Sequence, residues 1–261
     1  MSIHKWQYAE HPFFDCAAAQ LTQVCRFPSA LTSGEIQELR EAGRKLRDAQ
    51  YATLRRIHQE GEYRTTWLQA EPQASNDDIV RKLVGFMSLA DETSGWHLLK
   101  GGDFRIRCVE YHENASAGGS IGTGAATALH YDAGSLVTLD VMLSPTSAFD
   151  GGEFGCLEAD GSMRAHPFEQ GDALVFVSHK YHTARPVTRG TREVLVIELW
   201  RGPERHCPHR CLDPTGVCTY TNGNANDPAS DEELLPSLGL DEAPDDSEDE
   251  GDDESSRELQ Q

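Results

Sequence analysis

The clearest periodic pattern near the start of the chain lies in residues 31–50, "LTSGEIQELREAGRKLRDAQ". Its apolar positions at helical spacing include Ile36, Leu39 and Leu46. Thr32 stands three residues before Glu35, which is the arrangement of a capping box at the first turn of a helix. The pattern predicts an amphipathic helix that buries one face.

A second helix is predicted in residues 76–92, "NDDIVRKLVGFMSLADE", with Asn76 or Asp77 as its N-cap. Its apolar stripe consists of Ile79, Leu83, Phe86 and Met87. The two helices predict that residues 1–95 form an N-terminal helical support region.

From about residue 96 onward the helical spacing of apolar residues gives way to short strand-like runs. These runs are rich in β-branched and aromatic residues and are separated by Gly, Pro, Asp and Ser clusters. The runs are "FRIRCVEYHE", "SLVTLDVMLS", "DALVFVS" and "REVLVIELW". Their spacing predicts an antiparallel jelly-roll, or double-stranded β-helix, in residues 96–202. We therefore expect an α+β fold in which a helical layer supports a β core.

The net charge of −20 is concentrated at the end of the chain. From Asp227 to Gln261 there are 15 acidic residues and one arginine, so this segment supplies −14 of the total. Few apolar residues interrupt it, which predicts a disordered acidic tail over residues 225–261. Solubilisation and docking of a basic partner are both open as roles for this tail. Elsewhere no basic stripe occurs, so we expect no nucleic-acid binding.

Membrane association is not expected either. The chain contains no run of about 18 apolar residues, and its first residues lack the pattern of a signal peptide. We expect an intracellular protein, cytoplasmic or nuclear.

Seven cysteines, an odd number, argue against a disulfide framework. Three of them, Cys207, Cys211 and Cys218, alternate with histidines in "RHCPHRCLDPTGVC", within a Cys/His-rich extension expected at residues 203–224. These spacings suit zinc, although a second paired knuckle is missing. The sequence leaves zinc, a local disulfide and unliganded thiols open.

A possible metal pair stands in "LHYDAGSLVTLDVMLS", where His130 precedes Asp132 by two residues. Chance alone supplies about two such His-x-Asp or His-x-Glu matches at this composition, and His58 with Glu60 is another. Residues two apart diverge on a helix but share a face at a strand. The strand context therefore favours His130 and Asp132.

A third candidate ligand, His182, precedes Arg192 by ten residues in "HTARPVTRGTR". A three-residue hairpin turn through Thr188, Arg189 and Gly190 would place His182 and Arg192 on one face, about 13 Å apart. Such an arrangement suits a metal at one end and a small dicarboxylate held by the arginine at the other.

Two imidazoles and one carboxylate with open coordination positions make the facial triad of non-haem Fe(II) oxygenases. Over roughly Ala30 to Arg201 the sequence resembles the prolyl 4-hydroxylase-like branch of the 2-oxoglutarate and Fe(II) dependent dioxygenases. The resemblance is carried, in order, by "VEYHENASAGGS", "LHYD", "FDGGEFG", "QGDALVF", "HTARPVTRGTR" and "LW".

This resemblance implies that His130, Asp132 and His182 bind Fe(II), and that Arg192 holds the far carboxylate of 2-oxoglutarate. It implies a dioxygenase that uses O2, decarboxylates 2-oxoglutarate to succinate and CO2, and hydroxylates a prolyl or other side chain of a protein, with ascorbate as reductant. Two alternatives stay open. One is the same chemistry on a small molecule or as an oxidative demethylase, and the other is a non-catalytic jelly-roll binding module.

The family often carries a tyrosine on the strand after the His-x-Asp motif, and "LVTLDVML" has none. Tyr111 on the preceding strand and Thr138 are the substitutes expected at the 2-oxoglutarate site. His179 is a weaker candidate for the metal, and Arg189 is expected to face solvent. The histidines expected beside the site or at the surface are His112 and His166.

Overall fold

The computed structural model describes residues 15–54, 63–71, 77–116, 129–212 and 218. Contacts divide the chain into two units, Met1–Gly223 and Asn224–Gln261, and all of the described residues belong to the first. The predicted acidic tail and the pair His58 and Glu60 lie outside the described residues. Among the helices in the described ranges, none is long and apolar enough to cross a membrane.

The helices are α1 (Cys16–Gln20), α2 (Ser33–Leu54) and α3 (Asp77–Thr93), with single 3₁₀ turns at Leu68–Ala70 and Thr146–Ala148. The strands are β1 (Cys25–Phe27), β2 (Tyr63–Trp67), β3 (Arg105–Ala115), β4 (Val137–Met142), β5 (Phe149–Gly151), β6 (Phe154–Leu157), β7 (Met163–Ala165), β8 (Ala173–Val177), β9 (His182–Ala184) and β10 (Val187–Trp200). Both predicted helices and all four predicted strands are present.

The strands pair antiparallel in two sheets. In the large sheet the order is β1-β8-β4-β10-β3-β2, with β5 paired to the start of β10, and in the small sheet it is β7-β6-β9. This topology confirms the predicted α+β jelly-roll. The N-terminal region is less helical than expected, because β1 and β2 form the two edges of the large sheet.

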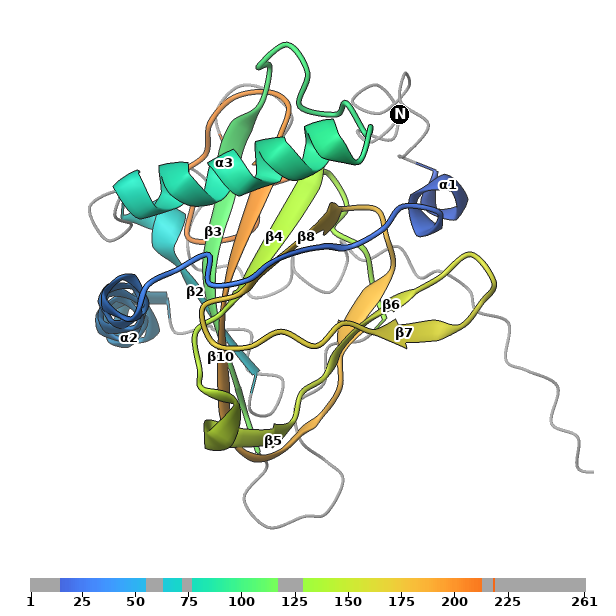
Figure 1. The fold of residues 1–261 in the computed structure, drawn as a ribbon. Coiled ribbons are helices and arrows are strands. Elements are labelled where there is room, and N and C mark those ends of the chain that lie inside the picture. Colours follow the sequence, from blue (N-terminus) through green and yellow to red (C-terminus); the bar gives the residue numbers. More distant parts are fainter. Residues whose placement is uncertain (1–14, 55–62, 72–76, 117–128, 213–217, 219–261) are drawn as a thin grey trace, which may run out of the picture. The chain divides into compact units, whose positions relative to one another are not determined.

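The large sheet has one face under the helices and one face toward the interior of the jelly-roll. Successive residues of β10 alternate between these faces. The residues of β10 that share a core with α3 are Leu195, Ile197 and Leu199. Those that pack instead with Phe154 of the small sheet are Val194 and Val196. Figure 1 shows α3 lying across the strands of the large sheet.

The N-terminus of α2 has the predicted capping box. The Thr32 amide donates to Glu35 Oε2 at 2.7 Å, and the Glu35 amide donates to Thr32 Oγ1 at 3.3 Å. Farther along, α2 approaches the sheet closely at Gly43, where a Cβ would lie 2.6 Å from Cγ of Tyr111. For α3, Asn76 lies outside the described residues, and so does the side chain of Asp77.

The predicted hairpin between the His182 and Arg192 strands is wrong. β9 pairs with β6 of the small sheet, whereas residues 187–190 already belong to β10 and pair with β5. Gly190 does have a positive φ, +74°, and it also approaches the end of the 3₁₀ turn before β5, since a Cβ there would lie 1.9 Å from the Ala148 carbonyl oxygen. His182 and Arg192 consequently belong to two different sheets.

Candidate metal centre

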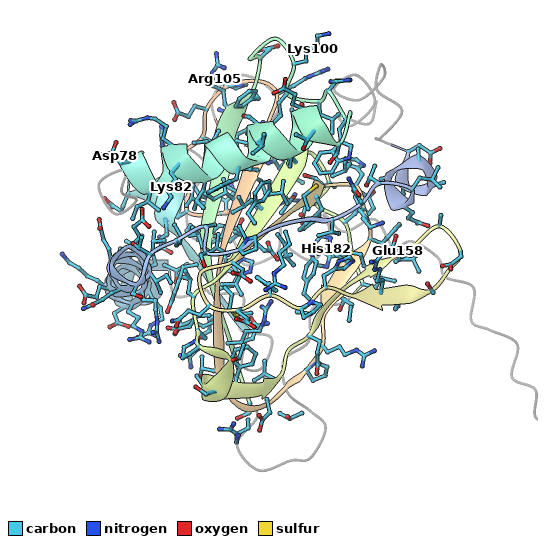
Figure 2. The ribbon with its side chains drawn as sticks, viewed as in Figure 1. Asp78, Lys82, Lys100, Arg105, Glu158 and His182 are labelled. Atoms are coloured by element: carbon cyan, nitrogen blue, oxygen red, sulfur yellow. The ribbon has the colours of Figure 1, made fainter. Side chains whose placement is uncertain are left out.

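His130, Asp132 and His182 come together in the described part of the chain. One nitrogen or oxygen atom from each lies within 4.8 Å of the other two. The Nε2 atoms of His130 and His182 are each 3.7 Å from an oxygen of Asp132. Figure 2 labels His182 beside the small sheet. The three residues predicted as ligands from sequence are therefore the three that the fold brings together.

Backbone hydrogen bonds hold these residues in place. The His130 and His182 amides each donate to the carbonyl of the other, at 3.0 and 2.8 Å. The Asp132 amide donates to the Ser178 carbonyl at 2.8 Å, just beyond β8. Two strand ends in different sheets thus define the position of the segment that carries His130 and Asp132.

The ring of His182 presents Nε2 as a lone-pair donor. Its Nδ1 lies 2.9 Å from the Lys180 carbonyl oxygen, which can only accept, so the proton is on Nδ1. Phe154 and Phe176 pack on the ring, with centroids 5.6 and 4.8 Å away. Burial lowers the pKa of His182 to about 4, which keeps the imidazole neutral at neutral pH.

Asp132 is buried and ionised. Burial alone would raise the pKa of its carboxyl, but the neighbouring imidazoles, the charge of Arg210 and a hydrogen bond from Thr138 outweigh burial and lower it. Thr138 Oγ1 donates to Asp132 Oδ2 at 2.6 Å and also contacts Ser178 Oγ at 2.8 Å. Thr138 therefore acts on the candidate metal centre by orienting Asp132, one of its three ligands.

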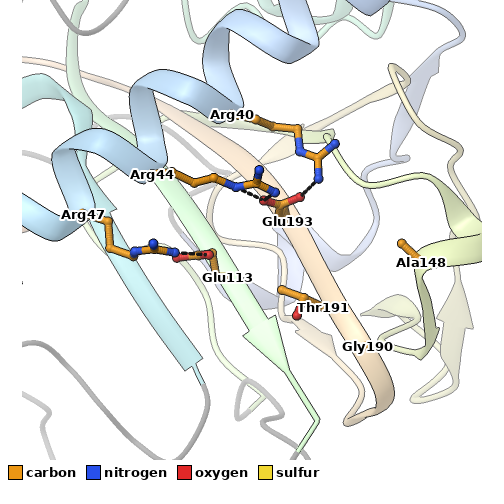
Figure 3. Close-up of a pocket in the computed structure, with 8 residues that line it drawn as sticks. All are labelled: Arg40, Arg44, Arg47, Glu113, Ala148, Gly190, Thr191 and Glu193. Atoms are coloured by element: carbon orange, nitrogen blue, oxygen red, sulfur yellow. Dashed lines mark hydrogen bonds and ion pairs between the residues drawn. The ribbon is translucent and has the colours of Figure 1, made fainter.

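The expected role of Tyr111 needs correction. Tyr111 is fully buried on the helix-covered face, in the core shared with α3, and its hydroxyl donates to Glu193. Glu193 also pairs with Arg40 and Arg44 of α2, at 2.5 and 2.8 Å, beside the pocket drawn in Figure 3. Tyr111 thus lies on the opposite face of the sheet from His182 and has no access to a molecule bound there.

Arg192 is 4% exposed and belongs to the interior face of β10. Its Cζ lies 5.7 Å from the ring of Phe168, and Phe168 packs on Phe154, which in turn contacts His182. The charge of Arg192 also acts on the carboxyl of Asp140. Burial raises the pKa of Asp140 to about 7, and Arg192 opposes that rise.

The other residues singled out from sequence are not members of the three-residue cluster. His179 is buried against Tyr131, with ring centroids 5.1 Å apart. Arg189 is 60% exposed and pairs with Asp150, as expected of a residue that faces solvent. The partly buried histidines beside carboxylates are His112, 2.7 Å from Glu110, and His166, 3.6 Å from Glu158.

Sequence reasoning missed a buried ion pair between the C-terminal extension and the interior. Arg210 donates to both oxygens of Glu198, at 3.0 and 2.9 Å, and the indole of Trp200 donates to Glu198 Oε2 at 2.8 Å. The guanidinium groups of Arg107 and Arg210 lie 4.6 and 5.1 Å from the Trp200 ring centroid. The sequence did hold a sign of this pair, because Glu198 is a charged residue within the apolar run "LVIELW" and a buried charge needs a partner.

This donor set fits Fe(II). Two imidazoles and one carboxylate, with one ligand atom from each within 4.8 Å of the others, are the ligands of the facial triad. The hydrogen bond from Thr138 and the one to Lys180 fix the orientations of Asp132 and His182, as neighbours of metal ligands do.

The fold is that of the 2-oxoglutarate and Fe(II) dependent oxygenases. A structure of such an oxygenase from Burkholderia pseudomallei matches 76% of this chain and 94% of its own, with 16% identity and a TM-score of 0.51. The epimerase SnoN, solved with Fe3+, alpha ketoglutarate and nogalamycin RO, matches 79% of this chain and 94% of its own, with 16% identity and a TM-score of 0.52.

Sequence comparison gives a shorter match. A PKHD-type hydroxylase of Idiomarina loihiensis is 38% identical over 60 residues, which are 23% of this chain and 27% of that protein. The match thus spans about a quarter of the length of this relative. No family model matches the chain.

Proposed function

We propose that this chain is an Fe(II) and 2-oxoglutarate dependent dioxygenase that hydroxylates a prolyl or other side chain of a protein. The observation that carries the proposal is the convergence of His130, Asp132 and His182 in a jelly-roll. The similarity to a PKHD-type hydroxylase supports it. Iron bound by these residues would supply O2 activation coupled to decarboxylation of 2-oxoglutarate to succinate and CO2.

The side chains of the protein orient the metal ligands and provide a positive charge for the cosubstrate. Asp132 is held by Thr138, and His182 keeps its proton on Nδ1, so both present fixed lone pairs to the metal. Arg192 is the cation for the far carboxylate of 2-oxoglutarate, because its planar fork binds a carboxylate through two parallel hydrogen bonds. Phe154 and Phe176 exclude water from one side of His182.

The substrate approaches from the side of His130. Its side chain is 43% exposed, whereas those of His182 and Asp132 are 8% and 11% exposed. A protein side chain can therefore reach the metal from the His130 side without displacing the core.

The deciding experiment is succinate formation by the purified full chain with Fe(II), 2-oxoglutarate and a peptide library, beside a metabolite set that tests the small-molecule alternative. We expect a gain of one oxygen atom on a peptide, and loss of turnover in Asp132→Ala. Turnover that persists undiminished after the metal is removed would contradict the proposal.

Ascorbate and cellular location complete the proposal. Ascorbate should sustain turnover by returning oxidised iron to Fe(II), and withholding it should shorten the linear phase of succinate formation. We further propose an intracellular site of action, which imaging of the tagged full chain would test.

A further inference from the structure

A second group of metal-binding side chains lies in the C-terminal extension. Atoms of Cys207, His209, Cys211 and Cys218 all lie within 4.8 Å of one another. Cys218 Sγ and His209 Nε2 are 3.4 Å apart. None of these four residues belongs to the candidate iron centre, and the proposed dioxygenase chemistry does not use them.

The dimensions of the cluster match a tetrahedral zinc site. Zinc binds thiolate sulfur at about 2.3 Å and imidazole nitrogen at about 2.0 Å, so a sulfur and a nitrogen on one tetrahedron lie about 3.5 Å apart. The separation between Cys218 and His209 is already close to that value. Three thiolates with one imidazole are a common donor set of closed structural sites.

The cluster is enclosed and separate from the hydrophobic cores. Cys207, Cys211 and Cys218 are 6%, 3% and 4% exposed, and they form a buried cluster of their own. None of the three forms a disulfide in the structure. A disulfide would use two of them and leave the third beside an imidazole with no role, whereas a metal uses all four groups.

The backbone around the ligands is held from the core. The side-chain amide of Gln69 donates to the Cys207 carbonyl at 3.2 Å and accepts from the Val109 amide at 3.0 Å. Arg107 donates to the Cys211 carbonyl at 2.7 Å. The described residues 201–212 contain no helix or strand, so these contacts and the cluster hold the extension in place.

We propose that Cys207, His209, Cys211 and Cys218 bind a structural zinc ion. The protein supplies all four ligands, so the site has no open position for a substrate. His209 and Cys211 flank Arg210, whose guanidinium donates to Glu198 in the interior. Zinc binding therefore fixes the extension on the core and holds Arg210 against Glu198.

The test measures metal content of the full chain purified under reducing conditions. We expect one zinc per chain that survives dialysis, and its loss in Cys211→Ser. Cys25→Ser, which alters a half-buried thiol elsewhere in the same unit, is the matched control and should retain zinc. Asp132→Ala should also retain zinc, so the result does not depend on the proposed dioxygenase activity.

Cobalt provides a second measurement that does not require the cysteine variant to fold. Added to Asp132→Ala from which the zinc has first been removed with a chelator under reducing conditions, Co(II) should give thiolate charge-transfer absorption and the strong d–d bands of a tetrahedral site. Two results would overturn the proposal. One is a zinc-free wild-type chain whose thiols all react, with no such cobalt spectrum. The other is an intact mass lower by two hydrogens, with a disulfide within the cluster.

Discussion

At the candidate iron centre, the ligands depend on residues that do not bind metal themselves. Asp132 is oriented by the hydroxyl of Thr138, and His182 is oriented by a backbone carbonyl, which no substitution of Lys180 removes. Thr138 is therefore the neighbour whose contribution can be measured by mutation.

We expect Thr138→Val to weaken Fe(II) binding by about 10- to 100-fold, because the carboxylate loses the hydroxyl that orients it while the shape of the side chain is kept. Thr138→Ser keeps the hydroxyl and should bind metal nearly as well as the wild type. Mn(II) titration followed by electron paramagnetic resonance measures both affinities, and equal affinities in the two variants would contradict this role.

The pH dependence of stability should report on Asp140. Burial raises its pKa to about 7 in the folded chain, above the ordinary value of 3.8. Between these values the folded state holds a proton on Asp140 that the unfolded state has lost, so the contribution of Asp140 to the free energy of unfolding falls as pH rises from about 4 to about 7.

Asp140→Asn removes this titration. We expect the variant to match the wild type near pH 5 and to be more stable by about 2 to 3 kcal/mol near pH 8. Urea unfolding at the two pH values measures the difference. Asp150→Asn is the control, because the pKa of exposed Asp150 is lowered by Arg189 and it titrates below this range.

The ligand residues could be predicted from sequence, but the face on which Tyr111 lies could not. Alternation divides β3 into two sets, and the usual expectation is that the polar set faces solvent. Here the set that includes Glu110 and His112 faces the interior of the jelly-roll, because these two residues pair with Val196 and Val194 of β10, which lie on that face. The apolar set with Tyr111 is covered by helices instead.

Among the elements, the long periodic ones were predictable and the short ones were not. α2 and α3 follow their apolar stripes, and β4, β8 and β10 follow their aliphatic runs. β1 has three residues, which is too short for a pattern, and β2, "YRTTW", becomes a strand because it pairs with β3. The hairpin expected after β9 failed because pairing with β5 and β6 outweighed the local turn signal.

The packing of α2 on the sheet gives a prediction at this scale. Gly43→Ala should lower the free energy of unfolding by about 1 to 3 kcal/mol, because the new methyl group meets the ring of Tyr111 at 2.6 Å. Gly85→Ala in α3 has no atom within 4 Å and should raise it by up to about 1 kcal/mol. Urea unfolding checks both signs, and a Gly43→Ala variant as stable as Gly85→Ala would contradict this packing.

Across the molecule as a whole, a buried ion pair joins the extension to the interior, in addition to the hydrogen bonds from Gln69 and Arg107. The side chain of Glu198 is 3% exposed and that of Arg210 is 26% exposed. Burial raises the pKa of Glu198 to about 7, and the charge of Arg210 opposes that rise. The predicted boundary at residue 203 therefore marks a change of composition, while the described extension packs as part of the first unit.

We expect Arg210→Met to cost roughly 2 to 4 kcal/mol of stability, because it leaves a buried carboxyl without its cation. The double variant Glu198→Gln with Arg210→Met should recover much of this loss, since the amide remains an acceptor for Trp200. Denaturant unfolding of the three chains measures the coupling. Additive losses in the double variant would show that the pair is not coupled.

Trp200 gives the molecule a built-in optical reporter. Its ring is 1% exposed and lies under the guanidinium groups of Arg107 and Arg210, so its emission depends on where the extension sits. A change that releases Arg210 alters the electric field and the hydration at the indole at once. The chain has three other tryptophans, so in a variant that replaces them by phenylalanine the fluorescence of Trp200 can follow attachment of the extension in real time, separately from turnover at the iron centre.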